Sequence, residues 1–440
     1  MDEVRTLRTL LLAAAVVAML APAARAAERV TWWYENATPE QERILRADFV
    51  DRFNASQSQY VLDLRFDPNL DSSLRTALLA GSGPDIVFTH GVAYALPYIK
   101  NGQLMPLDDY AKRYGWYDRF LPVMISLGSH QGHLYALPKS YESMVLFYNK
   151  TLFQKNGWKV PSNREELEAL ARTMQAKGIV PFAQGNAGFR FANEHYVGVF
   201  LNHYAGAENI HKALTGKVPW NAPVFVDAIA LLNDYYQKGW LGKDYFSLTY
   251  EDYMTLLSTG RAAMTMNGTW AFQWMPAFFG QTGQEWDWAP LPALSDQASY
   301  PLFDLGIGAT LSINAAAKNA DGAAAVLDRL SGDKQVITDL NRDWPGEWNL
   351  PVTTLDASDF GDKVDPRYAR HADEVAEAVA RGNYGYTVWT FWPPKTESYI
   401  VEGIEQVWLG EVTPQQFMDR VNELFQQELA EGSVPPTPAR

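Results

Sequence analysis

Cysteine is absent from this 440-residue chain, and its absence excludes several kinds of site. Without thiols the chain forms no disulfide, binds no metal through thiolate and carries no lipid on an N-terminal cysteine. Histidine is also scarce: the seven residues are scattered, and the pair His130 and His133 has no matching third ligand. We therefore expect no metal, no cofactor, and a free protein rather than a lipid-tethered one.

Basic charge and long apolar runs are lacking as well. The chain has 37 Lys and Arg against 51 Asp and Glu, a net charge of −14, and no basic stripe. Nucleic-acid binding needs such a stripe and is excluded on this ground. Beyond residue 26, no apolar run approaches the roughly 18 residues that a membrane-spanning helix requires. We expect a monomer that is not inserted in a membrane once its leader is removed.

The first 26 residues have the order of a secretory signal peptide. Arg5 and Arg8 precede an apolar run over residues 10–20, and Ala24-Arg25-Ala26 follows. A basic start, a short apolar segment and small residues two apart predict cleavage after Ala26. An uncleaved amphipathic tail is the competing interpretation. With no cysteine for a lipid anchor, the pattern predicts export to the periplasm of a cell with an outer membrane.

Strand and helix patterns alternate along the rest of the chain. Residues 30–34 are typical of a strand, and Thr38-Pro39 of a helix start with Thr38 as its cap. Residues 86–88 and 179–183 are typical of buried strands. This alternation predicts α/β layers with mainly parallel strands, which bind ligands beyond the carboxyl ends of the strands. The tail after Gly432, rich in proline, is predicted to be disordered.

One segment, GRAAMTMNGTWAFQWM over residues 260–275, places a large aromatic residue at such an end. Residues 261–266 can form a strand, Asn267-Gly268 is a strong turn pair, and Thr269 can cap a helix beginning at Trp270. A sugar ring offers an apolar face to an aromatic side chain and hydroxyls to carboxylates or amides around its rim. The alternative is that Trp270 is a core anchor, as most tryptophans after a turn are.

Seven blocks, taken in order, resemble a known family. They are GSGPDIVF, LMPLDDY, GHLYALPKSYESMVLFYNKTLFQKNGW, REELEALARTMQAKGIVPFAQG, LLSTGRAAMTMNGTWAF, APLPAL and GIGATLSINAAAKN. The family is the extracellular solute-binding proteins of ABC transporters, specifically the maltose-binding-like, carbohydrate-uptake group (solute-binding protein family 1). Each block alone is a weak signal, whereas the seven in order are specific and span nearly all of the chain after the signal peptide.

The resemblance implies a two-lobed periplasmic-binding-protein fold of type II, with a ligand cleft between discontinuous lobes joined by hinge crossings. The expected division is a signal peptide at 1–26, an N-terminal lobe of 27–139 and 292–343, a C-terminal lobe of 140–291 and 344–432, and a disordered tail at 433–440. The three crossings are expected near residues 136–141, 291–293 and 342–348. The closed form, with a sugar held between the two lobes, would be recognised by a membrane permease.

The resemblance also implies ligand contacts at particular positions. Trp270 matches the family's stacking aromatic, Glu142 matches an acidic contact at the first crossing, and Tyr141 lies beside it. Trp389 or Trp392 falls in the region of a late aromatic contact. The other expected contacts lie at strand ends or where relatives bring the backbone near the ligand: Glu35, Asn36, His90, Asn186, Asp304 and Gly306.

The predicted function is capture without catalysis. A disaccharide or short oligosaccharide would stabilise the closed form and pass to permease subunits in the inner membrane. Two alternatives stay open. A secreted glycoside hydrolase would use two of the carboxylates Glu35, Glu142 and Asp304 across a scissile bond. The same scaffold can instead hold a polyamine or a glycerol-phosphate-type ester, for which Arg190 and Arg342 are the nearby cations.

Overall fold

The computed structural model describes residues 26–35, 37–355 and 357–438. Residues 1–25 of the predicted signal peptide, the predicted contact Asn36 and the last two residues of the tail lie outside this part of the chain. Among the described helices, none combines the length and the apolar character that crossing a membrane requires.

Strands and helices alternate along the chain as the sequence predicts. The strands are β1 (Glu28–Tyr34), β2 (Tyr60–Phe66), β3 (Ile86–Thr89), β4 (Ser129–His130), β5 (His133–Leu134), β6 (Ala136–Asn149), β7 (Val180–Phe182), β8 (Ala262–Gly268), β9 (Trp286–Ala289), β10 (Phe303–Ile313) and β11 (Tyr384–Tyr386). The predicted cap is confirmed, because the Thr38 hydroxyl accepts a hydrogen bond from the amide of Gln41 at the start of α2.

The helices before the middle of the chain are α2 (Pro39–Leu45), α3 (Asp51–Ser56), α4 (Leu70–Leu79), α5 (Val92–Lys100), α6 (Asp108–Tyr114), α7 (Trp116–Arg119), α8 (Pro122–Leu127), α9 (Lys150–Asn156), α10 (Arg164–Ala176), α11 (Ala192–Ala205) and α12 (Ala207–Leu214). Those after it are α13 (Pro223–Gln237), α14 (Tyr250–Ser258), α15 (Ala271–Gly280), α16 (Ala320–Gly332), α17 (Lys334–Asp343), α18 (Ala357–Phe360), α19 (Pro366–Ala380), α20 (Val388–Phe391), α21 (Pro394–Trp408) and α22 (Pro414–Ala430). A π-helix (Arg46–Val50) and a 3-10 helix (Gly361–Lys363) complete the set in the described residues.

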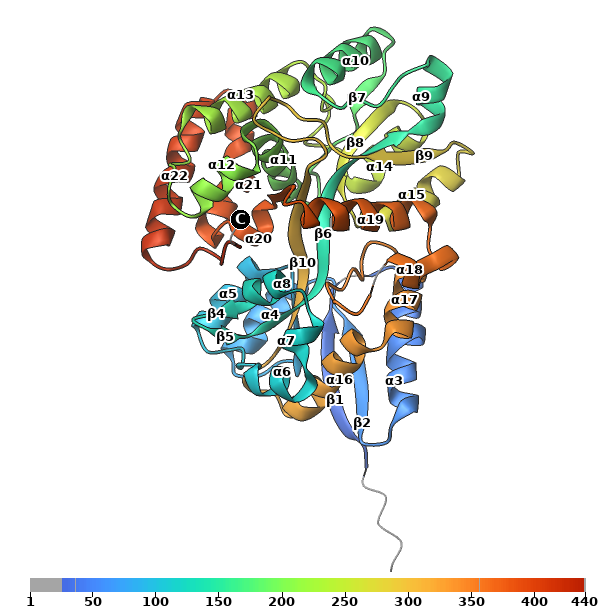
Figure 1. Cartoon of the computed structure of the whole chain (residues 1–440), viewed down its shortest axis with the longest axis vertical. Coiled ribbons are helices and arrows are strands. Elements are labelled where there is room, and N and C mark those ends of the chain that lie inside the picture. Colours follow the sequence, from blue (N-terminus) through green and yellow to red (C-terminus); the bar gives the residue numbers. More distant parts are fainter. Residues whose placement is uncertain (1–25, 36, 356, 439–440) are drawn as a thin grey trace, which may run out of the picture.

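A single sheet runs through the whole molecule in the order β2-β1-β3-β10-β6-β8-β7, with β11 paired to β10 and β9 to β6. The outer pairs β1–β2, β1–β3, β7–β8 and β10–β11 are parallel. The prediction of mainly parallel strands is wrong for the centre, where β10 is antiparallel to β3 and β6, and β6 to β8. The reason is that β6 and β10 carry the chain between the two halves in opposite directions (Figure 1).

The hydrophobic residues divide into two lobes, and Figure 1 shows β6 and β10 passing from one to the other. One cluster of buried residues, including Trp32 and Trp116, forms the core of the N-terminal lobe. Two clusters fill the C-terminal lobe on either side of its sheet. Strand β6 contributes Leu137 to the first core and Phe147 to the second lobe.

The core clusters also locate the other two crossings. Leu302 packs in the C-terminal lobe, while Leu311 packs in the N-terminal lobe, which puts the second crossing within β10 rather than near residue 292. Trp344 and Trp348 pack in the N-terminal core, although the expected boundary at 343–344 assigned them to the other lobe. Strand β10 therefore spans the junction, and the loop before it does not. The third crossing follows Val352, which is still part of the N-terminal core.

The prediction of a disordered tail is wrong for residues 433–438. Ser433 is 8% exposed and accepts a hydrogen bond from Lys100 on α5, and Pro435 is buried. Apolar contacts hold a segment that composition alone assigns to disorder.

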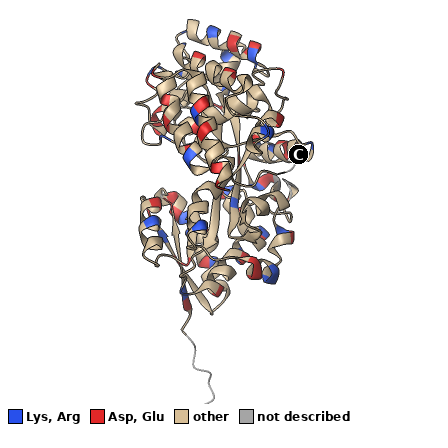
Figure 2. Cartoon of the chain, turned by 90° about the vertical axis from the view of Figure 1, so that its left-hand side faces the viewer, with Lys and Arg blue, Asp and Glu red and all other residues tan. Residues whose placement is uncertain are grey.

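Charged side chains are of both signs and are interspersed over both lobes in the view of Figure 2.

Candidate functional site

Trp270 lies where β8 ends and α15 begins, at the junction of the lobes. The indole folds back over Gly268, where any Cβ would collide with its six-membered ring, so glycine is required at that position. The helix begins at Ala271 with Trp270 itself at the N-cap position, and the predicted cap by Thr269 is wrong. Trp270 is half-buried rather than sealed in the core.

Three rings from separate elements meet around Trp270. The imidazole of His195 on α11 lies 5.0 Å from the indole of Trp270 and 5.2 Å from that of Trp389 on α20, and the two indoles are 6.0 Å apart. Burial lowers the pKa of His195 to about 3, so the imidazole is uncharged at neutral pH. The C-terminal lobe therefore presents a neutral aromatic wall at the junction.

The N-terminal lobe contributes charged groups to the same junction. Lys139 on β6 is 1% exposed and pairs with the carboxylate of Glu347, which also accepts a hydrogen bond of 2.8 Å from the hydroxyl of Tyr34. The Lys139 ammonium lies 4.5 Å from the ring centre of Trp348. Glu35, the residue after Tyr34, lies 3.8 Å from His90. Sequence analysis missed both Lys139 and Glu347.

Two carboxyls of this group have raised pKa values. Burial raises the pKa of Glu142 to about 8, with further increases from Glu347 and Glu35 and a decrease from Lys139. Burial also raises the pKa of Glu35, opposed by the nearby imidazole of His90. At neutral pH Glu142 is therefore largely a neutral acid, able to donate one hydrogen bond as well as accept.

Gly308 provides the seat for the Glu142 carboxyl. The ladder between β6 and β10 is irregular between Ile307 and Ala309, and Gly308 lies in that irregularity. A Cβ on Gly308 would collide with Oε1 and Cδ of Glu142. The bulge and the missing side chain together leave room for the carboxyl to lie across β10.

The carboxyls of Glu35, Glu142 and Glu347 lie near the rings of Trp270, His195 and Trp389 because the two lobes are in contact at the junction. The loop at Gly346, next to Glu347, touches the carbonyl of Thr269, so closely that a Cβ there would collide. On another edge of the junction, Gln41 of α2 donates a 2.6 Å hydrogen bond to Gln273 of α15. These contacts join the two lobes at the junction.

Among the expected contacts, Glu35, His90, Tyr141, Glu142, Trp270 and Trp389 lie at this junction. Tyr141 is half-buried, its amide donates to the carbonyl of Asn349 at 2.9 Å, and its ring packs against both C-terminal-lobe clusters. Burial raises its pKa to about 12. Gly306 lies opposite Glu142 in the ladder, but its Cα faces the hydroxyls of Thr387 and Thr390.

Other expected contacts lie inside the C-terminal lobe. Asp304 is 1% exposed and 3.5 Å from the buried His203, because β10 begins at Phe303 and the residue is part of a strand rather than a loop. Trp392 is fully buried, with its ring 4.8 Å from that of Trp220. The structure brings neither residue to the Trp270 group.

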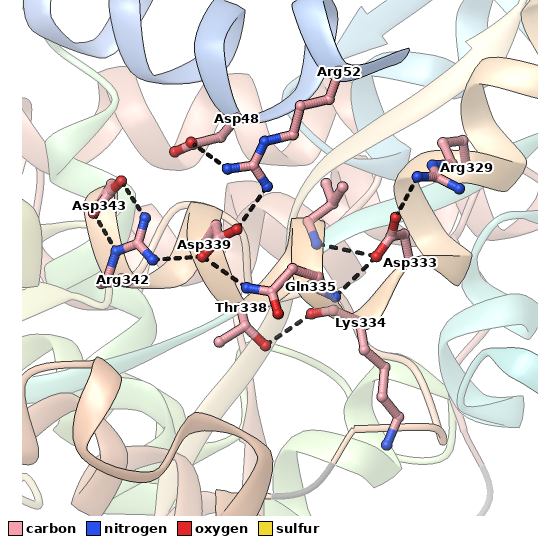
Figure 3. A network of polar contacts seen from close by, with 11 residues as sticks. Asp48, Arg52, Arg329, Asp333, Lys334, Gln335, Thr338, Asp339, Arg342 and Asp343 are labelled. Atoms are coloured by element: carbon pink, nitrogen blue, oxygen red, sulfur yellow. Dashed lines mark hydrogen bonds and ion pairs between the residues drawn. The ribbon is translucent and has the colours of Figure 1, made fainter. Parts of the chain in front are cut away.

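Asn186 and the two arginines have partners elsewhere. Asn186 donates to Glu405 on α21 at 3.0 Å, and the Arg190 guanidinium pairs with the same carboxylate at 2.6 Å. Arg342 on α17 pairs with Asp339 and Asp343 in a network that also includes Asp48 and Arg52 (Figure 3). Both candidate cations for an anionic ligand are thus already neutralised by carboxylates.

Comparison with known proteins gives consistent matches. The model of the bacterial extracellular solute-binding protein family matches residues 38–337. An uncharacterized ABC transporter extracellular-binding protein of Pyrococcus horikoshii is 27% identical over 232 residues, 51% of each chain. A multiple sugar-binding protein of Streptococcus mutans is 23% identical over 256 residues, 56% of this chain and 58% of that one. The chain thus spans about half the length of the curated relatives it matches.

Solved structures cover nearly the whole chain. A chitin oligosaccharide binding protein superposes with a TM-score of 0.77 at 20% identity, covering 92% of this chain and 99% of the other. At that identity the likeness establishes the two-lobed α/β fold and no more.

Proposed function

This chain belongs to the bacterial extracellular solute-binding protein family, and from that premise we propose that it is the periplasmic sugar-binding component of an ABC transporter. It captures a disaccharide or short oligosaccharide by closure of its two lobes and delivers it to permease subunits in the inner membrane. Relatives with sugar-binding names, such as that of Streptococcus mutans, support this assignment. The family is one of binding proteins, which supports capture without catalysis.

The observation that carries the proposal is the pairing of an aromatic wall with carboxyls at the lobe junction. Trp270 and His195, both partly exposed, offer uncharged ring faces to the C–H face of a sugar, and the buried indole of Trp389 packs against both. Glu35 lies on the opposite lobe and Glu142 on β6 where that strand crosses between the lobes, and both can exchange hydrogen bonds with hydroxyls. A ligand that touches both walls stabilises the closed form in proportion to the contacts made only there.

The alternatives have less support. A phosphate ester would meet carboxyls at the junction, while Arg190 and Arg342 are paired elsewhere. The interpretation as a glycoside hydrolase is weakened, because Asp304, one of its three candidate carboxylates, is buried beside His203. A polyamine would meet the carboxyls of Glu35 and Glu142 at the junction, but Glu142 with its raised pKa is a poor counter-ion at neutral pH.

A thermal-shift screen tests the proposal directly. The protein is heated with several dozen saccharides, and with spermidine and glycerol 3-phosphate as competing classes. A ligand at a hundredfold excess over its Kd stabilises the folded form by about 2.7 kcal/mol, which raises the melting temperature measurably. We expect a rise with one or more saccharides. A rise with spermidine or glycerol 3-phosphate alone would refute the sugar assignment, and shortening of an oligosaccharide on incubation would show a hydrolase.

A further inference from the structure

The C-terminal tail follows an ordered path that starts and ends on the C-terminal lobe and passes over the N-terminal lobe. It leaves α22 after Gly432, passes α5 and ends beside α12, where Pro438 contacts His211 (Figure 1). The backbone amide of Ser433 donates to the carbonyl of Glu428 at 2.8 Å, which fixes the start of the tail to α22. The side chain of Glu428 accepts hydrogen bonds from the backbone amides of Lys395 and Thr396. The tail therefore starts from a rigid part of the C-terminal lobe.

The far end of the described tail returns to the C-terminal lobe. The imidazole of His211 on α12 donates from Nε2 to the carbonyl of Pro438, with 3.0 Å between the two atoms. Between Ser433 and Pro438 the chain is thus held at both ends by the same lobe.

The middle of the tail rests on the N-terminal lobe. The Lys100 ammonium at the end of α5 donates to the Ser433 hydroxyl at 2.6 Å. Val434, Pro435 and Pro436 line a small cavity whose other walls come from α5, α8 and the start of β4, among them Val92, Ile99, Leu127 and His130. Val434 also packs against the cluster that fills the C-terminal lobe and extends to Val92 and Leu127. Contacts of the tail with both lobes are therefore both polar and apolar.

The composition of the tail suits it to span a junction. Three prolines among residues 433–438 restrict φ, so the unfolded chain has less conformational freedom to lose when the segment is fixed. A segment fixed to the C-terminal lobe and seated on the N-terminal lobe must lose its N-terminal-lobe contacts when the lobes separate. These contacts favour the closed arrangement by whatever free energy their loss costs.

We propose that residues 433–438 form an interlobe strap that holds the two lobes closed and thereby sets the proportion of closed protein before ligand arrives. The strap rests on the lobe closure of the proposed function but does not depend on which ligand is bound.

The test measures lobe separation without ligand. Because the chain has no cysteine, Asp109→Cys on α6 and Ala169→Cys on α10, both exposed, supply the only thiols for two spin labels, one per lobe. Distances are compared for the full chain and for a chain ending at Gly432. We expect the shortened chain to show a longer mean distance, and its affinity for the saccharide found in the screen to fall by on the order of tenfold, because apparent affinity scales with the closed fraction.

A point variant guards against loss of folding in the shortened chain. Val434→Asp places a charge against α5 and α8, and Gln426→Asp adds the same charge on an exposed face of α22 as the matched control. We expect Val434→Asp to lengthen the distance and Gln426→Asp to leave it unchanged. Unchanged distances in both strap variants, or equal lengthening in the control, overturn the strap. Failure to bind any saccharide would refute the proposed function but leave the distance result readable.

Discussion

The two lobes face their junction with different chemistry: the N-terminal lobe brings buried charge, and the C-terminal lobe brings neutral rings. Lys139 is 1% exposed and is held by Glu347, whereas Trp270 packs against the neutral imidazole of His195 and the indole of Trp389. Buried ions are tolerated only when partners are fixed around them, while ring contacts lack strict direction. We infer that the charged wall matters chiefly to the fold and to orientation, and the aromatic wall chiefly to affinity.

The largest effect should follow removal of the buried cation. Lys139→Met keeps the apolar stem but leaves the Glu347 carboxylate without its ammonium partner. Breaking a buried pair in this way costs about 3–5 kcal/mol of unfolding free energy. Urea unfolding followed by tryptophan fluorescence measures the loss.

Lys212→Met is the matched control for Lys139→Met. Lys212 pairs with Glu208 on the surface, with side chains 42% and 76% exposed, and exposed pairs contribute less than about 1 kcal/mol. If the two variants lost equal stability, the charged wall would have no special place in the fold, and the contrast between the walls would fail.

The next largest effect concerns the aromatic wall. Trp270→Ala should weaken saccharide binding by about 1–4 kcal/mol, as truncation of other aromatic anchors does, while the melting temperature changes little because the indole is half-buried. Titration calorimetry measures the binding. Trp274→Ala, four residues along α15 with its ring 5.8 Å from Tyr250, is the control and should leave affinity unchanged. Equal losses in the two variants would contradict a stacking role for Trp270.

The sequence located residues of the lobe junction where they lie at the end of a strand. Glu35 directly follows β1, and Trp270 lies two residues beyond β8, although the turn predicted at Asn267-Gly268 is wrong because both residues belong to β8. Asp304 was expected near the ligand from the family resemblance alone, but the residue belongs to β10 and faces His203. Side-chain direction within a strand depends on where the strand starts, which the pattern leaves uncertain by a residue or two.

Residues of the junction that lie inside helices and long loops could not be predicted from the sequence. His195 is in the first turns of α11 in a segment without a clear family pattern, and only the packing of α11 against α20 brings it to Trp270. Glu347 was within the expected third crossing, yet its contact with Lys139 joins residues 208 apart in the chain. The ordered tail could not be predicted either, because its proline-rich composition does not indicate which surface on α5 it covers.

A smaller effect should follow a change that moves Glu142 without altering it. Gly308→Ala introduces a methyl where the Glu142 carboxyl lies, so the carboxyl must leave its seat. The loss of one hydrogen bond to the ligand costs about 1–2 kcal/mol of binding free energy. Gly280→Ala is the control, because a Cβ there meets nothing within 4 Å.

A double-mutant cycle shows whether Gly308 acts through Glu142. If it does, Gly308→Ala should weaken binding in the wild-type background and have no further effect in Glu142→Gln. Additive losses would mean that Gly308 matters for another reason, such as the bulge in β10, and the charged wall would then lose its proposed role in orientation.

The smallest effect is the contribution of Glu142, on the charged wall, to the dependence of stability on pH. The Glu142 carboxyl has an ordinary pKa of 4.5 and a folded-state pKa of about 8, so between these values the folded chain binds a proton that the unfolded chain has released. Stability then falls as pH rises from about 4.5 to 8. Glu142→Gln removes this titration, so the difference in unfolding free energy between wild type and variant should shift by at least about 1 kcal/mol between pH 5 and pH 8.5, against the wild type. Trp270→Ala, on the other wall, should leave the pH profile parallel to that of the wild type. A parallel profile for Glu142→Gln as well would mean that Glu142 is ionised in the closed form, and the junction would then carry a full negative charge where we expect a neutral hydrogen-bond donor.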